Sequence, residues 1–394
     1  MRRAYKFRAY PTRPQQGRAA AVLRDHCDLY NAALEERREA WRKCRVSLTY
    51  GVQSAQLKEI RRADPGGQGR HSFTAQQQTL RRLDTVFSAF YARAAKGRAG
   101  YPRFKPCSRF DQVMFVNRDG ARWQPATGSR WARASLQAVG SVKVRQHRPV
   151  PGTVKTLQLK REHRRWYVIV VAEAAPVPLP ATCREIGADL GVARFLTTCD
   201  GEVVANPRFL AASQLVIAEL QRRKDRARRG SGNRKRIRRQ LAREWRKVRN
   251  RRRDFHHKTA RGLVNNCDVI ALEKLNTAGM TRRPRPEPDP GQPSVFLPNQ
   301  AAAKAGLNKV ILDAGWAQFT GILAAKAESA GRRVVLVNPA GTSITCHACG
   351  QRCTRPRQDT VICPRCGPWD ADVNGARNIY ARAGLGSGQA APPA

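Results

Sequence analysis

The chain has 394 residues, a formal net charge of +45 at pH 7 and a pI of about 11.3. Hydrophobic residues make up 41% of it, which is enough for packed cores in more than one domain. No apolar run is as long as the roughly 18 residues that mark a transmembrane helix, and we expect no secretory signal at the N-terminus. An excess of positive charge this large repels itself unless a polyanion neutralises it. We therefore expect a nucleic-acid partner, no membrane and no small-molecule substrate.

The first hundred residues combine one strand with two helices. Residues 2–10 alternate polar and apolar side chains and predict a β-strand. Apolar side chains then recur every three or four residues over 13–45 and again over about 74–95, which predicts a helix in each range. The segment Gly100–Pro106 ends the second helix.

Residues 111–174 have the pattern of β-structure. The segment Asn117–Gly120 predicts a hairpin turn, and Trp166–Val171 is an apolar strand. Residues Pro176–Pro180 predict a linker, after which a new domain begins.

The second half begins as a small sheet. Residues 186–191, 193–199 and 202–205 predict three antiparallel strands, followed by a long helical hairpin that turns at Gly230–Gly232. A buried strand is predicted at 267–273, and a mobile loop with six prolines follows at 284–298. Beyond the loop we expect a helix at about 301–330, a strand at 334–337 and a final helix at 372–383.

The helical hairpin is strongly basic. Residues 221–260 contain 19 Lys and Arg against three acidic residues. A charge run of this kind is usually a solvated face. Here the basic residues lie on all sides of the helices, with Trp245 and Phe255 between them, which favours contact with the phosphates of a nucleic acid.

Two CxxC pairs lie near the C-terminus. They consist of Cys346, Cys349, Cys363 and Cys366. Their spacing predicts a tetrahedral, structural zinc site, because four thiolates leave no open position for water; the alternative is two pairs of unligated thiols. We expect neither His347 nor Cys353 to bind the zinc. The other cysteines of the eleven are scattered, which fits a reducing cytoplasm better than a disulfide framework.

Three carboxylates are candidates for a catalytic site. Asp189 lies in a strand between Gly187 and Gly191, small neighbours that would admit a sugar–phosphate backbone. Glu273 ends an apolar strand, and Asp372 begins the last helix, where it could be only an N-cap. The order of strand with Asp, hairpin, strand with Glu and helix with Asp is the layout of the RNase H-like nuclease fold. Three such acids could hold two Mg²⁺ ions.

Several short segments carry a resemblance to a known family. In chain order they are Tyr5–Thr12, Tyr30–Asn31, Gly100–Lys105, Gly187–Gly191, Leu272–Leu275, Gly306–Trp316, Thr342–Ser343 and Asp372–Asn378. They resemble the TnpB proteins of bacterial insertion sequences, compact RNA-guided nucleases related to type V CRISPR effectors. The resemblance runs along nearly the whole chain, and its last segment is the most specific.

The resemblance implies a fold class of α/β structure together with a β-barrel and a helical lobe. The implied parts are a wedge-type β-barrel (1–12 and 105–178), an inserted helical recognition lobe (13–104), a RuvC-like, RNase H-like nuclease domain (181–340 and 369–384), a zinc-binding insert of ribbon type (341–368) and a disordered tail (385–394). It also implies that Asp189, Glu273 and Asp372 are the catalytic acids and the ligands of two Mg²⁺ ions.

The chain departs from the family pattern at two positions beside these acids. Lys274 follows Glu273 where the family often has Asp, and Ala371 precedes Asp372 where it often has Arg. Neither change removes a carboxylate. The proline-rich loop at 284–298 occupies the place of the nuclease lid, with an unusual composition.

The implied function is an RNA-guided, Mg²⁺-dependent DNA endonuclease of a transposable element, which cuts DNA beside a short adjacent motif. Its partners would be a guide RNA and a target DNA, in the cytoplasm of a bacterium and in action at the nucleoid. Two alternatives stay open: a guide-dependent DNA-binding protein without cleavage, and a transposase that joins DNA strands directly.

Overall fold

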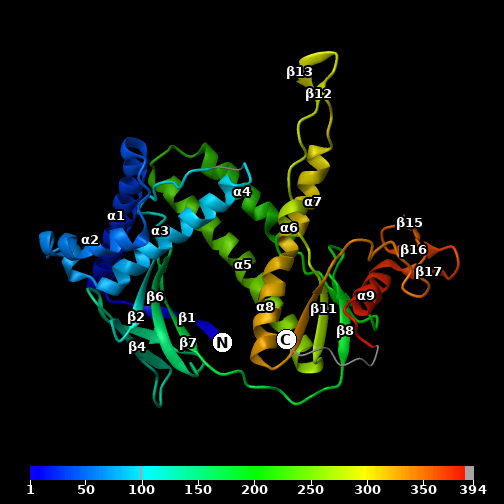
Figure 1. Ribbon diagram of the computed structural model, residues 1–394, viewed down its shortest axis with the longest axis horizontal. Coiled ribbons are helices and arrows are strands. Elements are labelled where there is room, and N and C mark those ends of the chain that lie inside the picture. The colour runs from blue at the N-terminus through cyan, green and yellow to red at the C-terminus, as the bar shows by residue number, and fades with distance from the viewer. Residues whose placement is uncertain (98–99, 387–394) are drawn as a thin grey trace. The chain divides into compact units, whose positions relative to one another are not determined.

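The computed structural model describes residues 1–97 and 100–386, and most of the tail predicted at 385–394 lies outside them. The chain divides into two compact units, the first ending at Ala175 and the second beginning at Pro176 (Figure 1). Over the described ranges, no helix is both long enough and apolar enough to cross a membrane.

The first unit contains a closed β-barrel with the strand order β1-β5-β4-β3-β2-β6-β7. Its strands are β1 (Arg2–Tyr10), β2 (Gln112–Asn117), β3 (Gly120–Gln124), β4 (Trp131–Leu136), β5 (Gly140–Arg145), β6 (Thr153–Glu162) and β7 (Arg165–Glu173). The predicted strand at 2–10 is confirmed, and it pairs antiparallel with both β5 and β7. Burial alternates along β7, so that Trp166, Val168 and Val170 fill the core.

The hairpin predicted at Asn117–Gly120 is wrong. β2 and β3 meet only in a short parallel pairing, with Val116 opposite Gly120. Arg118 and Gly120 have φ values of 72° and 78°, so the chain kinks there, and β3 pairs with β4 while β2 pairs with β6. The sequence of this segment indicates only that the backbone can adopt positive φ values. Such values occur at a kink between two strands as well as in a hairpin turn.

Three helices accompany the barrel: α1 (Arg13–Cys44), α2 (Tyr50–Ala63) and α3 (Phe73–Ala94), with a short 3₁₀ turn at Gln68–Arg70. The predictions of α1 and α3 are confirmed, whereas α2 was not predicted. Only Gln53 and Leu57 are buried on α2, so it lacks the apolar stripe by which a helix is recognised. Polar contacts hold it instead: Gln53 donates to Glu36 at 2.6 Å and accepts from Arg37 at 2.8 Å.

The second unit contains a five-stranded sheet with the order β10-β9-β8-β11-β14. Its strands are β8 (Glu185–Asp189), β9 (Arg194–Thr198), β10 (Val203–Ala205), β11 (Val269–Glu273) and β14 (Arg333–Val337). β8, β9 and β10 are antiparallel, as predicted, and β11 runs parallel to both β8 and β14. The carboxyl ends of β8 and β11 therefore meet at one edge of the sheet.

Helices follow the strands of the second unit. They are α4 (Gln214–Arg226), α5 (Gly232–Asn266), α6 (Thr277–Met280), α7 (Ala301–Ala314), α8 (Trp316–Ser329) and α9 (Ala371–Arg382), with a 3₁₀ turn at Ala211–Ser213. The hairpin of α4 and α5 is confirmed, and Ser231 caps α5 by accepting from the Arg234 N–H at 3.1 Å. The single helix predicted at 301–330 is wrong, because Gly315, with φ of 68°, separates α7 from α8.

The two faces of this sheet have different partners. Ile186, Ala188 and Leu272 lie in one apolar cluster with residues of α5 and α8. Val269 and Ala271 lie in another cluster with Ile379 of α9. Because side chains alternate along a strand, residues two positions beyond Gly187 and Ala271 point to the face that α9 covers.

The proline-rich segment was predicted to be a mobile loop, but in the structure it contains a small hairpin. β12 (Pro288–Asp289) pairs antiparallel with β13 (Gln292–Phe296), and Asp289 Oδ1 accepts from the Gly291 N–H at 2.9 Å in the turn. In Figure 1 this hairpin stands out beyond the start of α7. A proline is tolerated at the first residue of such an isolated strand, because no ladder bond is lost there.

Candidate active site and cysteine cluster

Asp189 and Glu273 lie at the same edge of the sheet. β8 and β11 are parallel neighbours, with Ala188 opposite Leu272, so the next residue of each strand is a carboxylate. Both side chains point to the face of the sheet that α9 covers, since each lies two residues beyond a small residue on that face. Parallel pairing thus brings together two acids that are far apart in the sequence.

Asp372 lies in the first turn of α9, which packs on the same face. A Cβ at Gly375, one turn later, would lie 3.5 Å from the Asp189 carboxyl carbon. Asp189 and Asp372 also line one cavity of about 630 Å³. The structure therefore brings the three predicted acids to one place.

The glycines around Asp189 were expected to make room for a sugar–phosphate backbone, but in the structure they have another role. A Cβ at Gly187 would lie 2.3 Å from the Ala376 carbonyl oxygen, and one at Gly191 would lie 2.7 Å from the Arg194 carbonyl oxygen. Gly187 thus allows α9 to approach β8, and Gly191 allows a tight turn. The space at both glycines is taken by the protein's own backbone and not by a nucleic acid.

Burial raises the pKa of all three acids, and at Asp189 the charges of the other two add to this effect. Burial, together with the charges of Glu273 and Asp372, raises the pKa of Asp189 to about 7. Burial also raises the pKa of Glu273, against a hydrogen bond from Thr342 that lowers it. Burial raises the pKa of Asp372, although the nearby Arg194 opposes the rise. Such a cluster favours the binding of cations.

Residues to which the sequence assigned no role hold these acids in place. Thr342 Oγ1 donates a hydrogen bond to Glu273 Oε1. Asp370, and not Asp372, is the N-cap of α9, because its Oδ1 accepts from the Asp372 N–H at 3.0 Å. Arg194 pairs with Asp370 at 2.7 Å and approaches Asp372 at 3.7 Å. The alternative that Asp372 is only a cap is therefore wrong, and its carboxylate faces the cavity.

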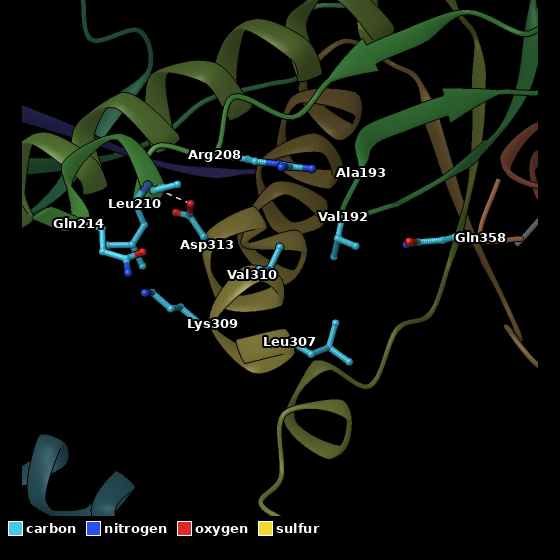
Figure 2. A pocket seen from close by; sticks show the side chains of 11 residues that line it. Val192, Ala193, Arg208, Leu210, Gln214, Leu307, Lys309, Val310, Asp313 and Gln358 are labelled. Carbon is cyan, nitrogen blue, oxygen red and sulfur yellow. Dashed lines mark hydrogen bonds between the residues drawn. The ribbon is translucent and has the colours of Figure 1, made fainter. Parts of the chain in front are cut away.

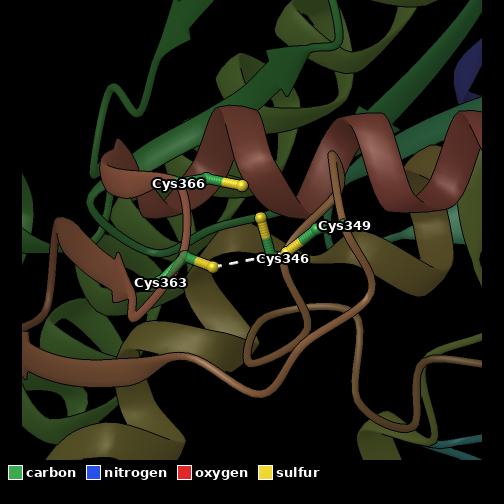
Figure 3. A group of neighbouring side chains, drawn as sticks. All are labelled: Cys346, Cys349, Cys363 and Cys366. Atoms are coloured by element: carbon green, nitrogen blue, oxygen red, sulfur yellow. Dashed lines mark hydrogen bonds between the residues drawn. The ribbon is translucent and has the colours of Figure 1, made fainter.

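The four predicted cysteines converge, as Figure 3 shows. The Sγ atoms of Cys346, Cys349, Cys363 and Cys366 all lie within 4.8 Å of one another. Cys353 is buried beside this group and does not belong to it. Over the ranges that the structure describes, the three carboxylates form no comparably tight group, so the thiols are the more compact set.

Backbone N–H groups favour the thiolate form of two of these cysteines, Cys346 and Cys363, whereas the neighbouring thiols raise the pKa of Cys366 to about 12. Burial opposes the ionisation of Cys363, but the N–H groups of Cys366 and Arg365, together with the thiols of Cys349 and Cys346, lower its pKa to about 6. Burial likewise opposes ionisation of Cys346, and the N–H groups of Cys349 and Ala348 lower its pKa. Thiolates are the form that binds zinc, so these four cysteines could hold a structural zinc ion.

The segment that carries the cysteines contributes to the carboxylate cavity. It forms a three-stranded sheet of β15 (Thr354–Arg357), β16 (Thr360–Cys363) and β17 (Gly367–Asp370). Arg355, Gln358 and Asp359, around the turn between β15 and β16, line the cavity together with Asp189 and Asp372.

Side chains of α9 fasten the cysteine segment to the sheet. Asn374 Nδ2 donates to the Thr345 carbonyl at 2.8 Å, and Asn378 Nδ2 donates to the same oxygen at 2.7 Å. The His347 N–H donates to Asn374 Oδ1 at 2.9 Å, and the His347 ring contacts Arg377. His347 therefore positions α9 against the cysteine segment.

The α4–α5 hairpin carries the predicted basic surface. The three acidic residues of 221–260 are already paired with lysines of the same stretch: Asp225 with Lys224, Glu244 with Lys247 and Asp254 with Lys258. The remaining cations greatly outnumber these carboxylates. Trp245 is 42% exposed, whereas Phe255 packs against Phe195 in the core. Of the two aromatic residues singled out in the sequence, only Trp245 is available to a ligand.

Two family models match parts of the chain. One is described as "Probable transposase" and matches residues 168–283; the other is "Cas12f1-like, TNB domain" and matches residues 316–379. Among solved structures, the chain is similar to Cas12f1 in a Cas12f1–sgRNA–target DNA complex, with a TM-score of 0.58 and 12% identity over 96% of this chain and 98% of that one. The fold is thus of the predicted class: a closed β-barrel with helices, and a domain of RNase H-like fold with a cysteine-rich insert.

Curated relatives match along almost the whole chain. A "Putative RNA-guided DNA endonuclease" of Streptomyces pristinaespiralis is 30% identical over 393 residues, covering 98% of this chain and 90% of the relative. The "Putative RNA-guided DNA endonuclease InsQ" of Escherichia coli K12 is 29% identical over 384 residues, covering 96% and 91%. The chain belongs to the TnpB family of insertion-sequence proteins, which its sequence landmarks predicted.

Proposed function

We propose that this protein is an RNA-guided DNA endonuclease associated with a transposable element, and that Asp189, Glu273 and Asp372 are its catalytic acids. The observation that carries the proposal is the convergence of these acids, from two parallel strands and one helix, beside a cavity of about 630 Å³. The names of both curated relatives support the reaction.

The donor set fits Mg²⁺. Carboxylate oxygens are the ligands that Mg²⁺ prefers. Burial, with the charges of Glu273 and Asp372, raises the pKa of Asp189 to about 7, and a bound cation would favour the ionised form of this carboxyl. Two bound Mg²⁺ ions would supply an activated water and charge stabilisation for the leaving 3′ oxygen. The chain's own part is to fix the ligands: Thr342 orients Glu273, and the N-cap Asp370 with Arg194 fixes the start of α9 beside Asp372.

We assign zinc to the four cysteines. Four thiolates from one short segment suit a closed tetrahedral site with no position for a substrate. Its role is to fold the segment so that Arg355, Gln358 and Asp359 line the carboxylate cavity.

Guide RNA and target DNA are the proposed partners. The basic surplus of the α4–α5 hairpin suits phosphate contacts, which position a nucleic acid without reading its sequence. In this proposal, residues 1–12 and 105–178 are the wedge barrel, 13–104 the recognition lobe, 181–340 and 369–384 the nuclease domain and 341–368 the zinc insert.

One specific observation favours another function. The family that matches residues 168–283 is described as "Probable transposase", and a strand transferase on an RNase H-like core would also use three acids. A transposase would need the DNA ends of the element and would give joined products. A guided nuclease would need RNA and would leave cut ends.

The test uses purified full-length protein, Mg²⁺ and a target plasmid, with and without cognate RNA. We expect cutting only with RNA, and we expect the cut to move when the guide sequence changes. Equal cutting in both reactions, or joined strands in either, would refute the guided-nuclease proposal. Guide-dependent binding without any cut would support the non-cleaving alternative.

A further inference from the structure

A second cavity lies beside the carboxylate cavity, within the second unit (Figure 2). Its volume is about 510 Å³, within the range of small-ligand pockets. Val192, Ala193, Leu307 and Gln358 line both cavities, so the two are continuous. A chain bound across the carboxylates would extend directly into this space.

The floor of this second cavity is apolar and open to a ligand. Val192, Leu210, Leu307 and Val310 line it, and Figure 2 shows the last two on α7. Leu307 is 45% exposed and Val310 is 37% exposed, which is unusual for large apolar side chains in a concave site. Covering them with a flat apolar group would remove this area from water.

The polar side chains around the floor have no partner of their own. Arg208, Gln214, Lys309 and Gln358 line the cavity. Within residues 1–97 and 100–386, their side chains make no hydrogen bond or ion pair. The cavity thus offers two free cations and two free amide groups around an apolar floor.

The wall around Arg208 is held in place by the protein. Asp313 Oδ2 accepts from the Leu210 N–H at 2.9 Å, and Arg252 pairs with the other oxygen of the same carboxylate. Arg208 itself has φ of 45°, a left-handed conformation that is costly for a residue other than glycine. The backbone of Arg208 is therefore strained and its guanidinium is unpaired among the described residues, a combination that often occurs at binding sites.

We propose that this cavity is a subsite for an unpaired nucleobase of the DNA strand that is cut, adjacent to the scissile phosphate. The proposal rests on the proposed function. A nucleobase has apolar faces for Leu307 and Val310 and polar edges for Gln214 and Gln358, while Arg208 and Lys309 suit the flanking phosphates. The subsite would hold the strand in register across the carboxylates and would require local unpairing of the DNA.

The experiment scans the target for the base that enters the cavity. Targets carry one abasic nucleotide, placed in turn at each position on either side of the mapped cut, and are cut by full-length protein with guide RNA and Mg²⁺. We expect one position at which the abasic target is cut about tenfold more slowly than the intact target. Uniform cutting of all abasic targets by a protein that cuts intact DNA would overturn the subsite alone. No guide-dependent cut of intact DNA would overturn the proposed function, and the subsite with it.

Two variants connect this position to the cavity. Val310→Trp fills the space, so intact DNA should be cut about tenfold more slowly and the abasic penalty should disappear. The matched control is Leu312→Trp on the same helix, whose side chain is 60% exposed and does not line this cavity; it should behave as the wild type. An unchanged abasic penalty in Val310→Trp would overturn the assignment.

Arg208→Ala tests the same subsite without adding bulk. The Arg208 side chain is exposed and makes no hydrogen bond or ion pair with the part of the chain that the structure describes, so its loss should leave the fold intact. We expect a KM for target DNA raised severalfold with little change in kcat, because a phosphate contact made before the reaction is lost. Equal KM values for this variant and the wild type would remove Arg208 from the subsite.

Discussion

The carboxylate cluster and the cysteine cluster both consist of side chains of the kinds that bind metal ions, and they are assembled in opposite ways. The four thiols come from one segment of 21 residues, Cys346–Cys366, and lie within 4.8 Å of one another. The three carboxylates come from two strands and a helix that span residues 189–372, and they are brought together by strand pairing and helix packing. A local cluster depends on its own turns, whereas a distributed cluster depends on the whole domain.

The largest expected effect concerns the carboxylate cluster, whose proposed role is catalytic. Asp189→Asn should reduce guide-dependent cleavage by about a thousandfold or more, because a ligand of the proposed ions is lost. Guide and target binding should be largely unchanged, since the variant removes none of the positive charge that is proposed to contact phosphates. Cleavage is measured on a plasmid, and binding by gel shift. Wild-type cutting by this variant would remove Asp189 from the mechanism.

The cysteine cluster should behave as one local folding unit. Cys363→Ser should reduce the bound zinc from about one equivalent to well below half, because one of four thiolates is lost. Hydrogen exchange should rise in the segment 341–368 and stay low in β8 and β11. The matched control is Cys353→Ser, which removes a buried thiol outside the set and should keep the zinc. Full zinc content in Cys363→Ser would refute the assigned ligand set.

The carboxylate cluster should respond to a change in packing that removes no ligand. Gly187→Ala places a methyl group 2.3 Å from the Ala376 carbonyl oxygen, so α9 must move away from β8. We expect a loss of about 2 to 4 kcal/mol of stability, as for overpacking against backbone, and cleavage reduced by at least about tenfold. Chemical denaturation and cleavage rates measure the two effects. Zinc content should be unchanged, and its loss would mean that the two clusters are not independent.

The smallest expected effect is a dependence on pH. The pKa of Asp189 is raised to about 7, so the folded protein holds a proton that the unfolded chain, with an ordinary value of 3.8, has lost. This stabilisation is fully present below pH 3.8 and is lost as the pH rises through about 7. In magnesium-free buffer, the free energy of unfolding of the wild type should therefore fall between pH 5 and pH 8.

Asp189→Asn is the control for this effect and should show a smaller fall. Mg²⁺ should bind the wild type more tightly at pH 8 than at pH 6, because binding displaces the proton. Calorimetric titration at the two pH values measures the difference. Equal affinities would mean that Asp189 is already ionised in the folded protein.

The sequence predicted the parts of the fold whose signals are local. Periodicity predicted α1, α3 and the strands around Asp189, and CxxC spacing predicted the thiol cluster. It did not predict α2, because that helix is held by polar contacts of Gln53 with Glu36 and Arg37. At Asn117–Gly120 the residues that permit positive φ were recognised, but the strand pairing that separates a kink from a hairpin is not local.

The tertiary structure decided the features that depend on contacts between distant segments. The sequence identified Asp189, Glu273 and Asp372 as candidates through their order and a family resemblance, and their catalytic role stays a prediction. The sequence alone did not reveal that Gly187 admits α9, that Thr342 orients Glu273 or that Asp370 caps α9. The Gly187 and Thr342 contacts join segments that are far apart in the sequence. The Asp370 cap is a local contact, and the sequence offered Asp372 for that position instead. Charge, cysteine spacing and periodicity are properties of short stretches, so the chain itself determined them; the shared edge, the cavities and the supporting hydrogen bonds arise only when β8, β11 and α9 meet.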